Sequence, residues 1–146
     1  QTINLSELVK DRVDNCRRIY LEGKKIDFEL EIQPELLVLV DSNYMRQVVD
    51  NLVINSIKFS SEGVVNITLL QQENHIEFTI SDNGIGIPQS DLYDIFTPFK
   101  MGSNTESKAE GRGVGLALCK AAIEAHGGSI TADSKNGKGA IFKFFL

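Results

Sequence analysis

The fold is decided by residues 64–88, which read VVNITLLQQENHIEFTISDNGIGIP. Apolar and β-branched residues fill positions 64–70 except for Asn66, and apolar and polar residues alternate strictly through 75–81, as in half-buried strands. The polar residues 71–74 between them predict a turn that joins two strands. Because the alternation in the second strand is unbroken, we expect a sheet with one packed face and one face in water.

The segments on either side of this hairpin predict helices and further strands. Apolar residues recur at helical spacing in residues 6–23, 42–59 and 114–126, with Ser42 as the N-cap of the second helix. Strand patterns fill residues 26–32, 129–134 and 140–146, residues 36–40 form a short apolar strand or an extended link, and residues 89–95 form a short helix. The strands come in neighbouring pairs, so we expect an α+β fold with three main helices on one face of a mixed, mostly antiparallel sheet of about five strands.

Composition limits the class of protein. The 146 residues suit one domain, and 42% hydrophobic with 24% charged residues is ordinary for a globular chain. A net charge of −5 argues against a basic nucleic-acid binder.

Cys16 and Cys119 lie far apart in helical patterns, which suggests neither a disulfide nor a zinc site and fits a reducing, cytoplasmic compartment. No apolar stretch approaches the ~18 residues of a membrane span. The start, Gln1-Thr2-Ile3, lacks both Met and a signal pattern, so we expect a segment of a longer protein.

A polar stripe interrupts the second predicted helix. Asn51, Asn55 and Lys58 are three or four residues apart and therefore share one helix face. Asparagine is a poor residue for a helix interior, so two at this spacing call for a reason. One interpretation is a solvated face. The other is a face for Mg²⁺ and phosphate, because amide oxygens suit this hard ion and lysine offers phosphate a point charge.

Two glycine-rich segments follow along the chain. Asp82-x-Gly84-x-Gly86 comes directly after a strand, where it is either an ordinary turn or a place where a ligand approaches the backbone closely. The segment 111–116, GRGVGL, enters a helix whose free N–H groups attract anions. A long polar loop precedes it instead of a strand, so it fails the test for a dinucleotide-binding fold. That loop, residues 97–112, has the length of a functional lid.

In this order and spacing, the segments resemble the N box (51–60), G1 box (82–88), F box (95–99) and G2 box (111–116, with 125–128) of the GHKL superfamily. The similarity is greatest to the catalytic ATP-binding domain of sensor histidine kinases. It covers residues 24–146 and implies a two-layer, Bergerat-type ATP-binding fold with an ATP lid at 97–112. Residues 1–23 would then link the domain to an upstream dimerisation and phosphoacceptor domain that is absent from this chain.

The resemblance also implies roles for single residues. Asp82 would accept a hydrogen bond from the adenine amine, Asn55 would coordinate Mg²⁺, and Asn51 and Lys58 would help to hold the metal and phosphates during catalysis. Lid residues Lys100, Lys108 and Arg112 are candidates to meet the γ-phosphate. The remaining nucleotide-binding positions would be Phe59, Gly84, Gly86, Ile87, Phe99, Gly113, Val114, Gly115 and Leu116.

The function implied is transfer of the γ-phosphoryl group of Mg-ATP to a histidine on the upstream helix, and from there to an aspartate of a response regulator. The parent protein would be a homodimer, and this domain would contact neither nucleic acid nor membrane. Relatives that hydrolyse ATP carry a glutamate where this chain has Asn51, and Asp50 points about 100° away around the helix, so water activation looks absent. We interpret His75 and His126 as structural, so the chain alone should not autophosphorylate. The alternatives are a non-catalytic nucleotide-binding module and a serine kinase or ATPase of the anti-sigma type.

Overall fold

The computed structural model describes residues 1–60, 62–97, 115–134 and 138–146. Within them the elements are, in order, β1 (Thr2–Asn4), α1 (Leu5–Tyr20), β2 (Lys25–Ile32), β3 (Leu37–Leu39), α2 (Ser42–Lys58), β4 (Glu62–Gln71), β5 (Ile76–Ser81), α3 (Gln89–Leu92), α5 (Gly115–Ala125), β6 (Ser129–Asp133) and β7 (Ile141–Phe145).

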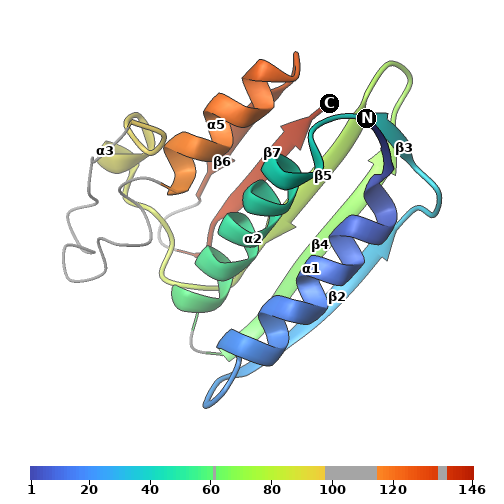
Figure 1. Cartoon of the computed structure of the whole chain (residues 1–146). Helices are drawn as coiled ribbons and strands as arrows, with labels where there is room; N and C mark the ends of the chain where they lie inside the picture. Colours follow the sequence, from blue (N-terminus) through green and yellow to red (C-terminus); the bar gives the residue numbers. More distant parts are fainter. Residues whose placement is uncertain (61, 98–114, 135–137) are drawn as a thin grey trace.

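The main sheet has the strand order β2-β4-β5-β7-β6. The β2–β4 pair is parallel, with α2 in the crossover between its strands, and the other pairs are antiparallel. Helices α1, α2 and α5 lie across one face of this sheet (Figure 1). The predicted α+β fold, a mostly antiparallel mixed sheet with helices on one side, is therefore confirmed. A second, small sheet pairs β1 with β3, which the sequence pattern did not indicate.

The core lies between the helices and the covered face of the sheet. Phe78 and Phe144 are fully buried on adjacent strands, and their rings stack with centroids 4.8 Å apart. The opposite face is polar, as the alternation in residues 75–81 predicts. There Lys143 lies 3.8 Å from Glu77 across the β5–β7 pair.

Helix α1 packs into this same core. Leu5, Val9 and Val13 are fully buried, as their helical spacing predicts, and Cys16 is 1% exposed. The side chain of Asn4 caps the helix by accepting a hydrogen bond from the backbone N–H of Glu7, at 3.1 Å. Residues 1–23 are thus an integral layer of the domain, whatever they connect to.

The N-cap of α2 is Asp41 and not Ser42, which corrects the sequence-based prediction. The Oδ1 atom of Asp41 accepts hydrogen bonds from the N–H groups of Asn43, at 2.9 Å, and of Tyr44, at 3.1 Å. Both residue types favour this position, and the carboxylate also suits the positive end of the helix dipole. His126 contacts the same end: its Nε2 accepts from the N–H of Asp41, and its Nδ1 lies 2.7 Å from the carbonyl oxygen of Ala122.

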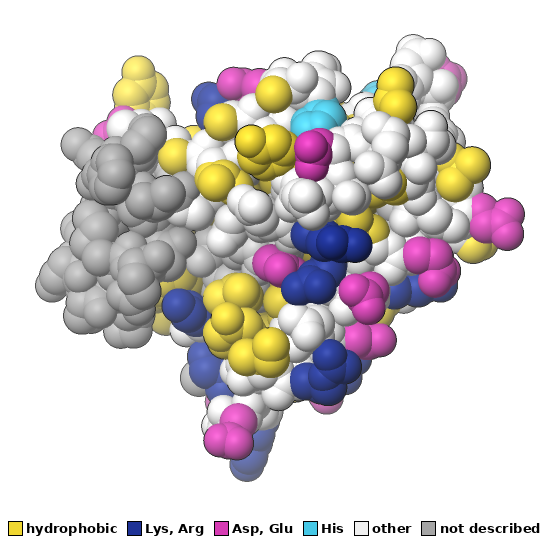
Figure 2. Space-filling model, viewed as in Figure 1, with side chains coloured by type: hydrophobic (Ala, Val, Ile, Leu, Met, Phe, Trp, Pro, Cys, Tyr) yellow, Lys and Arg dark blue, Asp and Glu magenta, His cyan; other side chains and the backbone are white. Residues whose placement is uncertain are grey.

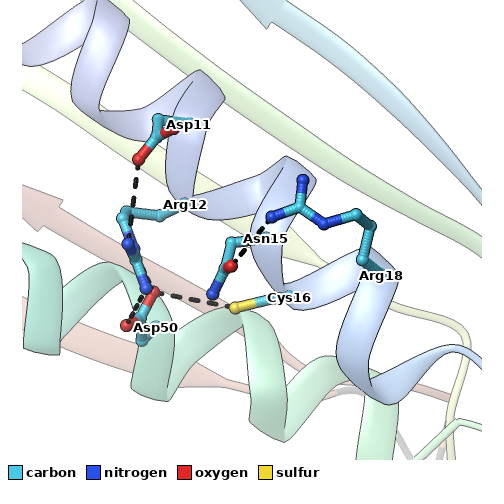
Figure 3. Close-up of polar contacts among 6 residues, drawn as sticks. All are labelled: Asp11, Arg12, Asn15, Cys16, Arg18 and Asp50. Atoms are coloured by element: carbon cyan, nitrogen blue, oxygen red, sulfur yellow. Dashed lines mark hydrogen bonds and ion pairs between the residues drawn. The ribbon is translucent and has the colours of Figure 1, made fainter.

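An ion pair joins α1 to the middle of α2 (Figure 3). The guanidinium of Arg12 donates two hydrogen bonds of 2.9 Å to the two carboxylate oxygens of Asp50. These hydrogen bonds raise the pKa of Arg12 above its ordinary value. The Cys16 thiol also contacts Asp50, at 3.6 Å. Burial of the thiol, and to a smaller extent the negative charge of Asp50, raises the pKa of Cys16 to about 12. The carboxylate of Asp50 therefore contacts side chains of α1 on both of its oxygens.

Replacing Arg12 by methionine should lower the free energy of unfolding by about 1–2 kcal/mol, because it leaves a half-buried carboxylate without its bidentate partner. Arg18→Met is the matched control. Arg18 lies on the same helix but makes only an exposed hydrogen bond to Asn15, so its loss should cost less than about 0.5 kcal/mol. Denaturant unfolding of both variants checks this, and equal losses would contradict it.

The helix-covered surface carries both signs of charge. Figure 2 shows Lys and Arg side chains beside Asp and Glu on this face, with hydrophobic side chains in small groups between them. No helix among residues 1–60, 62–97, 115–134 and 138–146 has the length and hydrophobicity needed to cross a membrane.

Candidate functional site

The polar stripe of α2 lies at the helix end nearest the loop after β5. Asn51 and Lys58 are half-buried, and Asn55 is buried, with 6% of its surface exposed. Asp50 points away from this stripe toward Arg12, as expected from its position around the helix. An asparagine buried on the stripe, rather than out in water, favours the ligand interpretation over that of a solvated face.

The start of α5 lies beside this stripe. A Cβ atom added to Gly115 would be 3.1 Å from the Oδ1 atom of Asn51, so the backbone of α5 approaches the asparagine closely. The two helices remain in contact further along, where the Cys119 thiol lies 3.7 Å from the carbonyl oxygen of Val48. Burial raises the pKa of Cys119 to about 12, as suits a core thiol. The predicted N box and the described part of the G2 box are thus neighbours.

Asp82 directly follows β5, and backbone donors fix its carboxylate. Its Oδ1 atom accepts hydrogen bonds from the N–H of Gly84, at 2.8 Å, and from the N–H of Ala140 before β7, at 3.3 Å. The N–H of Asp82 in turn donates to the carbonyl of Ala140, at 3.0 Å. The carboxylate therefore has a defined orientation before any ligand is considered.

Gly84 fits against the last turn of α2. A Cβ at this position would lie 2.1 Å from the carbonyl oxygen of Phe59 and 2.9 Å from the hydroxyl of Ser60. The next residue, Ile85, donates its N–H to the same Phe59 oxygen, at 3.2 Å. The absence of a side chain at Gly84 is what lets the G1 segment and the N box touch.

The apolar residues of the predicted site are part of the core. Phe59, Ile87 and Leu116 are 7%, 2% and 0% exposed. The backbone after Gly86 is held by Ser134, whose hydroxyl accepts from the N–H of Ile87, at 2.9 Å, and donates to the carbonyl of Gly139. The sequence analysis missed Ser134, because a serine at the end of a strand carries no pattern of its own.

Lys24 is a second residue that the sequence analysis missed. Its ammonium nitrogen donates to the carbonyl oxygens of Ile57, Lys58 and Ser60, at the C-terminal end of α2. Partial burial lowers the pKa of Lys24 below its ordinary value. The contact links the turn before β2 to the end of the polar stripe.

Several predicted positions lie outside the described residues. These are Phe99, Lys100, Lys108, Arg112, Gly113 and Val114, and with them nearly all of the predicted lid. The described residue Phe96 precedes them. Its ring packs edge-on against Phe142, with centroids 6.3 Å apart, and Lys120 lies over it.

The residues present fit a magnesium nucleotide. The stripe offers amide oxygens and an ammonium group, which suit Mg²⁺ and phosphate. Within the described part of the chain, no group of three or more His, Cys, Asp or Glu side chains could hold a metal ion. The buried hydroxyl of Ser60 has no hydrogen-bond partner among the described residues, which leaves a polar group unexplained beside Gly84.

This arrangement defines a class of protein, and comparison with known families agrees. The chain belongs to the family of histidine kinase-, DNA gyrase B- and HSP90-like ATPases, whose model matches residues 40–146. The expected resemblance to the catalytic domain of sensor histidine kinases is confirmed by individual relatives.

The sensor protein KdpD of Clostridium acetobutylicum is 36% identical over 142 residues, which cover 96% of this chain and 16% of KdpD. The structure of the mycobacterial sensor histidine kinase MprB matches with a TM-score of 0.87 and 28% identity, covering 100% of this chain and 97% of that one. The structure of the catalytic domain of the histidine kinase ThkA matches with a TM-score of 0.85 and 29% identity, covering 100% of this chain and 93% of that one. The chain thus spans about a sixth of the curated relative and nearly all of the two solved chains.

Proposed function

We propose that this chain binds Mg-ATP and donates its γ-phosphoryl group to a histidine on an upstream dimerisation helix of a longer parent protein. A response regulator would then accept the phosphoryl group on an aspartate. The proposal covers the nucleotide, the metal, the acceptor and the partners. Family membership supports ATP binding, and the relatives named sensor kinases support the direction of transfer.

One observation carries the proposal. Three segments that are far apart in sequence meet around the C-terminal half of α2: Gly115 lies against Asn51, and Gly84 lies against Phe59. Asp82, two residues before Gly84, has its carboxylate fixed by two backbone N–H groups. An anion-attracting helix start, a polar stripe and an oriented carboxylate therefore lie together near the C-terminal end of α2, beside the loop that follows the central strand β5 (Figure 1).

Each group has a chemical task in the proposed reaction. Asp82 accepts a hydrogen bond from the exocyclic amine of adenine, and the start of α5 and Lys58 offer positive charge to the phosphates. Asn55 and Asn51 would hold Mg²⁺, which when bound neutralises charge on the phosphate oxygens. Asn51 cannot take a proton from water, so the site favours transfer to a positioned nucleophile over hydrolysis. Phosphoryl transfer of this kind depends on positioning and charge stabilisation.

Calorimetric titration of the chain with ATP, ADP and GTP, with and without Mg²⁺, tests the first half of the proposal. ATP and ADP should bind, and GTP should bind at least about a hundredfold more weakly, because guanine has a carbonyl where adenine has its amine. Absence of adenine-nucleotide binding in the presence of Mg²⁺ would refute it. Fusion to the parent's upstream helices should yield phosphohistidine, whereas ATP binding without it would indicate a non-catalytic module.

Replacing Asn55 by alanine should remove most of the gain in ATP affinity that Mg²⁺ provides. Mutation of a residue that merely supports a metal ligand typically lowers metal affinity by about tenfold or more. Loss of a direct ligand should lower it at least as much. Asn66→Ala on the exposed surface of β4 is the matched control, and its affinity should equal that of the unmodified chain. Titrations with and without Mg²⁺ separate the metal-dependent part, and an unchanged Mg²⁺ dependence in Asn55→Ala would rule out this role.

A further inference from the structure

The end of α2 has an unusual hydrogen-bonding partner. The last carbonyl groups of a helix have no partner within the helix and must find one elsewhere. Here the ammonium group of Lys24 donates to two of them, the carbonyl oxygens of Ile57 and of Lys58, at 3.2 Å, and also to that of Ser60 just beyond the helix, at 2.9 Å. A lysine ammonium has three donors, so this side chain uses its full capacity on one helix end.

The carbonyl of Phe59 lies between those of Lys58 and Ser60 along the chain, and it has a different partner. It accepts the N–H of Ile85 at 3.2 Å and lies where a side chain on Gly84 would stand. The carbonyls on both sides of it are those that Lys24 holds. Lys24 thus binds the carbonyls on both sides of the one that accepts from the loop after β5.

We propose that Lys24 is a positioning residue for the nucleotide site: it fixes the end of α2 and thereby aligns the stripe on that helix with the loop after β5. The inference rests on the proposed function for the identity of the ligand. Lys24 itself touches only backbone oxygens, so it acts through Lys58 and Gly84 and not on the nucleotide. Its positive charge at the negative end of the helix dipole reinforces the contact.

The neighbouring lysine makes a matched control possible. Lys25 carries the same side chain and charge, begins β2 and is exposed. Lys24→Met and Lys25→Met therefore change the net charge equally and differ in the loss of the α2 contact. Lys24→Arg keeps the charge and several N–H donors, so it should rescue most of what methionine loses.

Two readouts test the inference. Calorimetry with ATP and Mg²⁺ should show about a tenfold weaker binding for Lys24→Met, comparable to the loss of other residues that orient ligands, and no change for Lys25→Met. Amide hydrogen exchange should show faster exchange at Ile85 in Lys24→Met alone, since its acceptor at Phe59 is no longer held. A general loss of stability would speed exchange throughout the core. Faster exchange at Ile85 therefore supports the inference only where a core amide such as that of Phe78 exchanges as in the unmodified chain.

The outcomes are separable from those for the proposed function. A folded Lys24→Met with unchanged Ile85 exchange and unchanged affinity overturns the inference, and so does an equal loss of affinity in Lys25→Met. If the unmodified chain binds no ATP, the proposed function fails, and the exchange rates of Ile85 still decide whether Lys24 positions the loop. If Lys24→Met does not fold, Lys24→Gln, which keeps one amide donor group, replaces it in both measurements.

Discussion

Replacement of Gly84 by alanine should weaken ATP binding by about a hundredfold or more, because displacing a positioned group by about 1 Å can cost that much. The new Cβ would stand 2.1 Å from the carbonyl oxygen of Phe59, and ordinary contact begins at 3.4 Å. The obstacle is backbone and not a flexible side chain, so either the loop or the end of α2 must move. The variant should also lose about 2–3 kcal/mol of stability, as overpacked sites do.

Gly23→Ala serves as the control. A Cβ there meets no atom within 4 Å, but the residue has a φ of +80°, so alanine should cost about 1–2 kcal/mol from backbone strain alone. Its affinity for ATP should not change. Denaturant unfolding and calorimetry together distinguish the two variants. ATP affinity retained in Gly84→Ala would mean that the loop after β5 does not contribute to the site.

Replacement of Asp82 by asparagine should lower ATP affinity by about a hundredfold, the value of a lost hydrogen bond to a charged group. The substitution keeps the shape and turns one oxygen into an NH₂ group. If the amide oxygen faces the N–H groups of Gly84 and Ala140, the NH₂ group meets the adenine amine, donor against donor. If the amide is reversed, the NH₂ group meets the backbone donors instead. Neither orientation satisfies both sets of partners.

Asp27→Asn is the control. Asp27 is an exposed residue of β2, so its substitution removes the same charge at a distance from the site and should leave the affinity for ATP unchanged. Comparing the affinities for ATP and GTP in each variant separates the contribution of the base from that of the phosphates, because the two nucleotides share the same phosphates. Asp82→Asn should lose the preference for adenine while keeping the weak affinity that the two nucleotides share. A preference for ATP that survives in Asp82→Asn would show that another group recognises the base.

Sequence patterns were sufficient to predict the layers of the fold and the polar stripe of α2. Strict alternation in β5 predicted which face of the sheet is buried, and the spacing of Asn51, Asn55 and Lys58 predicted a stripe on one side of a helix. These signals are periodic, so they can be recognised without knowing the partners. The strand β1 has three residues, which is too short for a period to be recognised, and the predicted strand at 36–40, which contains β3, carried no sign of its pairing with β1.

The contacts that hold the site together were not predictable from the sequence. Lys24 binds carbonyl oxygens 33 to 36 positions further along the chain, and every residue has such an oxygen, so no side-chain pattern marks the partner. The same holds for Ser134, which binds the backbone of Ile87 and Gly139. Asp41 and Ser42 are adjacent and both suit an N-cap, so only the geometry distinguishes them.

The parallel pairing of β2 with β4 has a consequence for where this domain can be cut. The match to the family model begins at residue 40, yet β2 pairs with β4 through residue 32, and α1 buries Val9 and Val13 against the core. A fragment trimmed to residues 40–146 would turn β4 into an open edge strand and uncover the apolar side of α2. Exposed strand edges and apolar patches are templates for aggregation, so the soluble unit for expression starts upstream of the recognisable motifs.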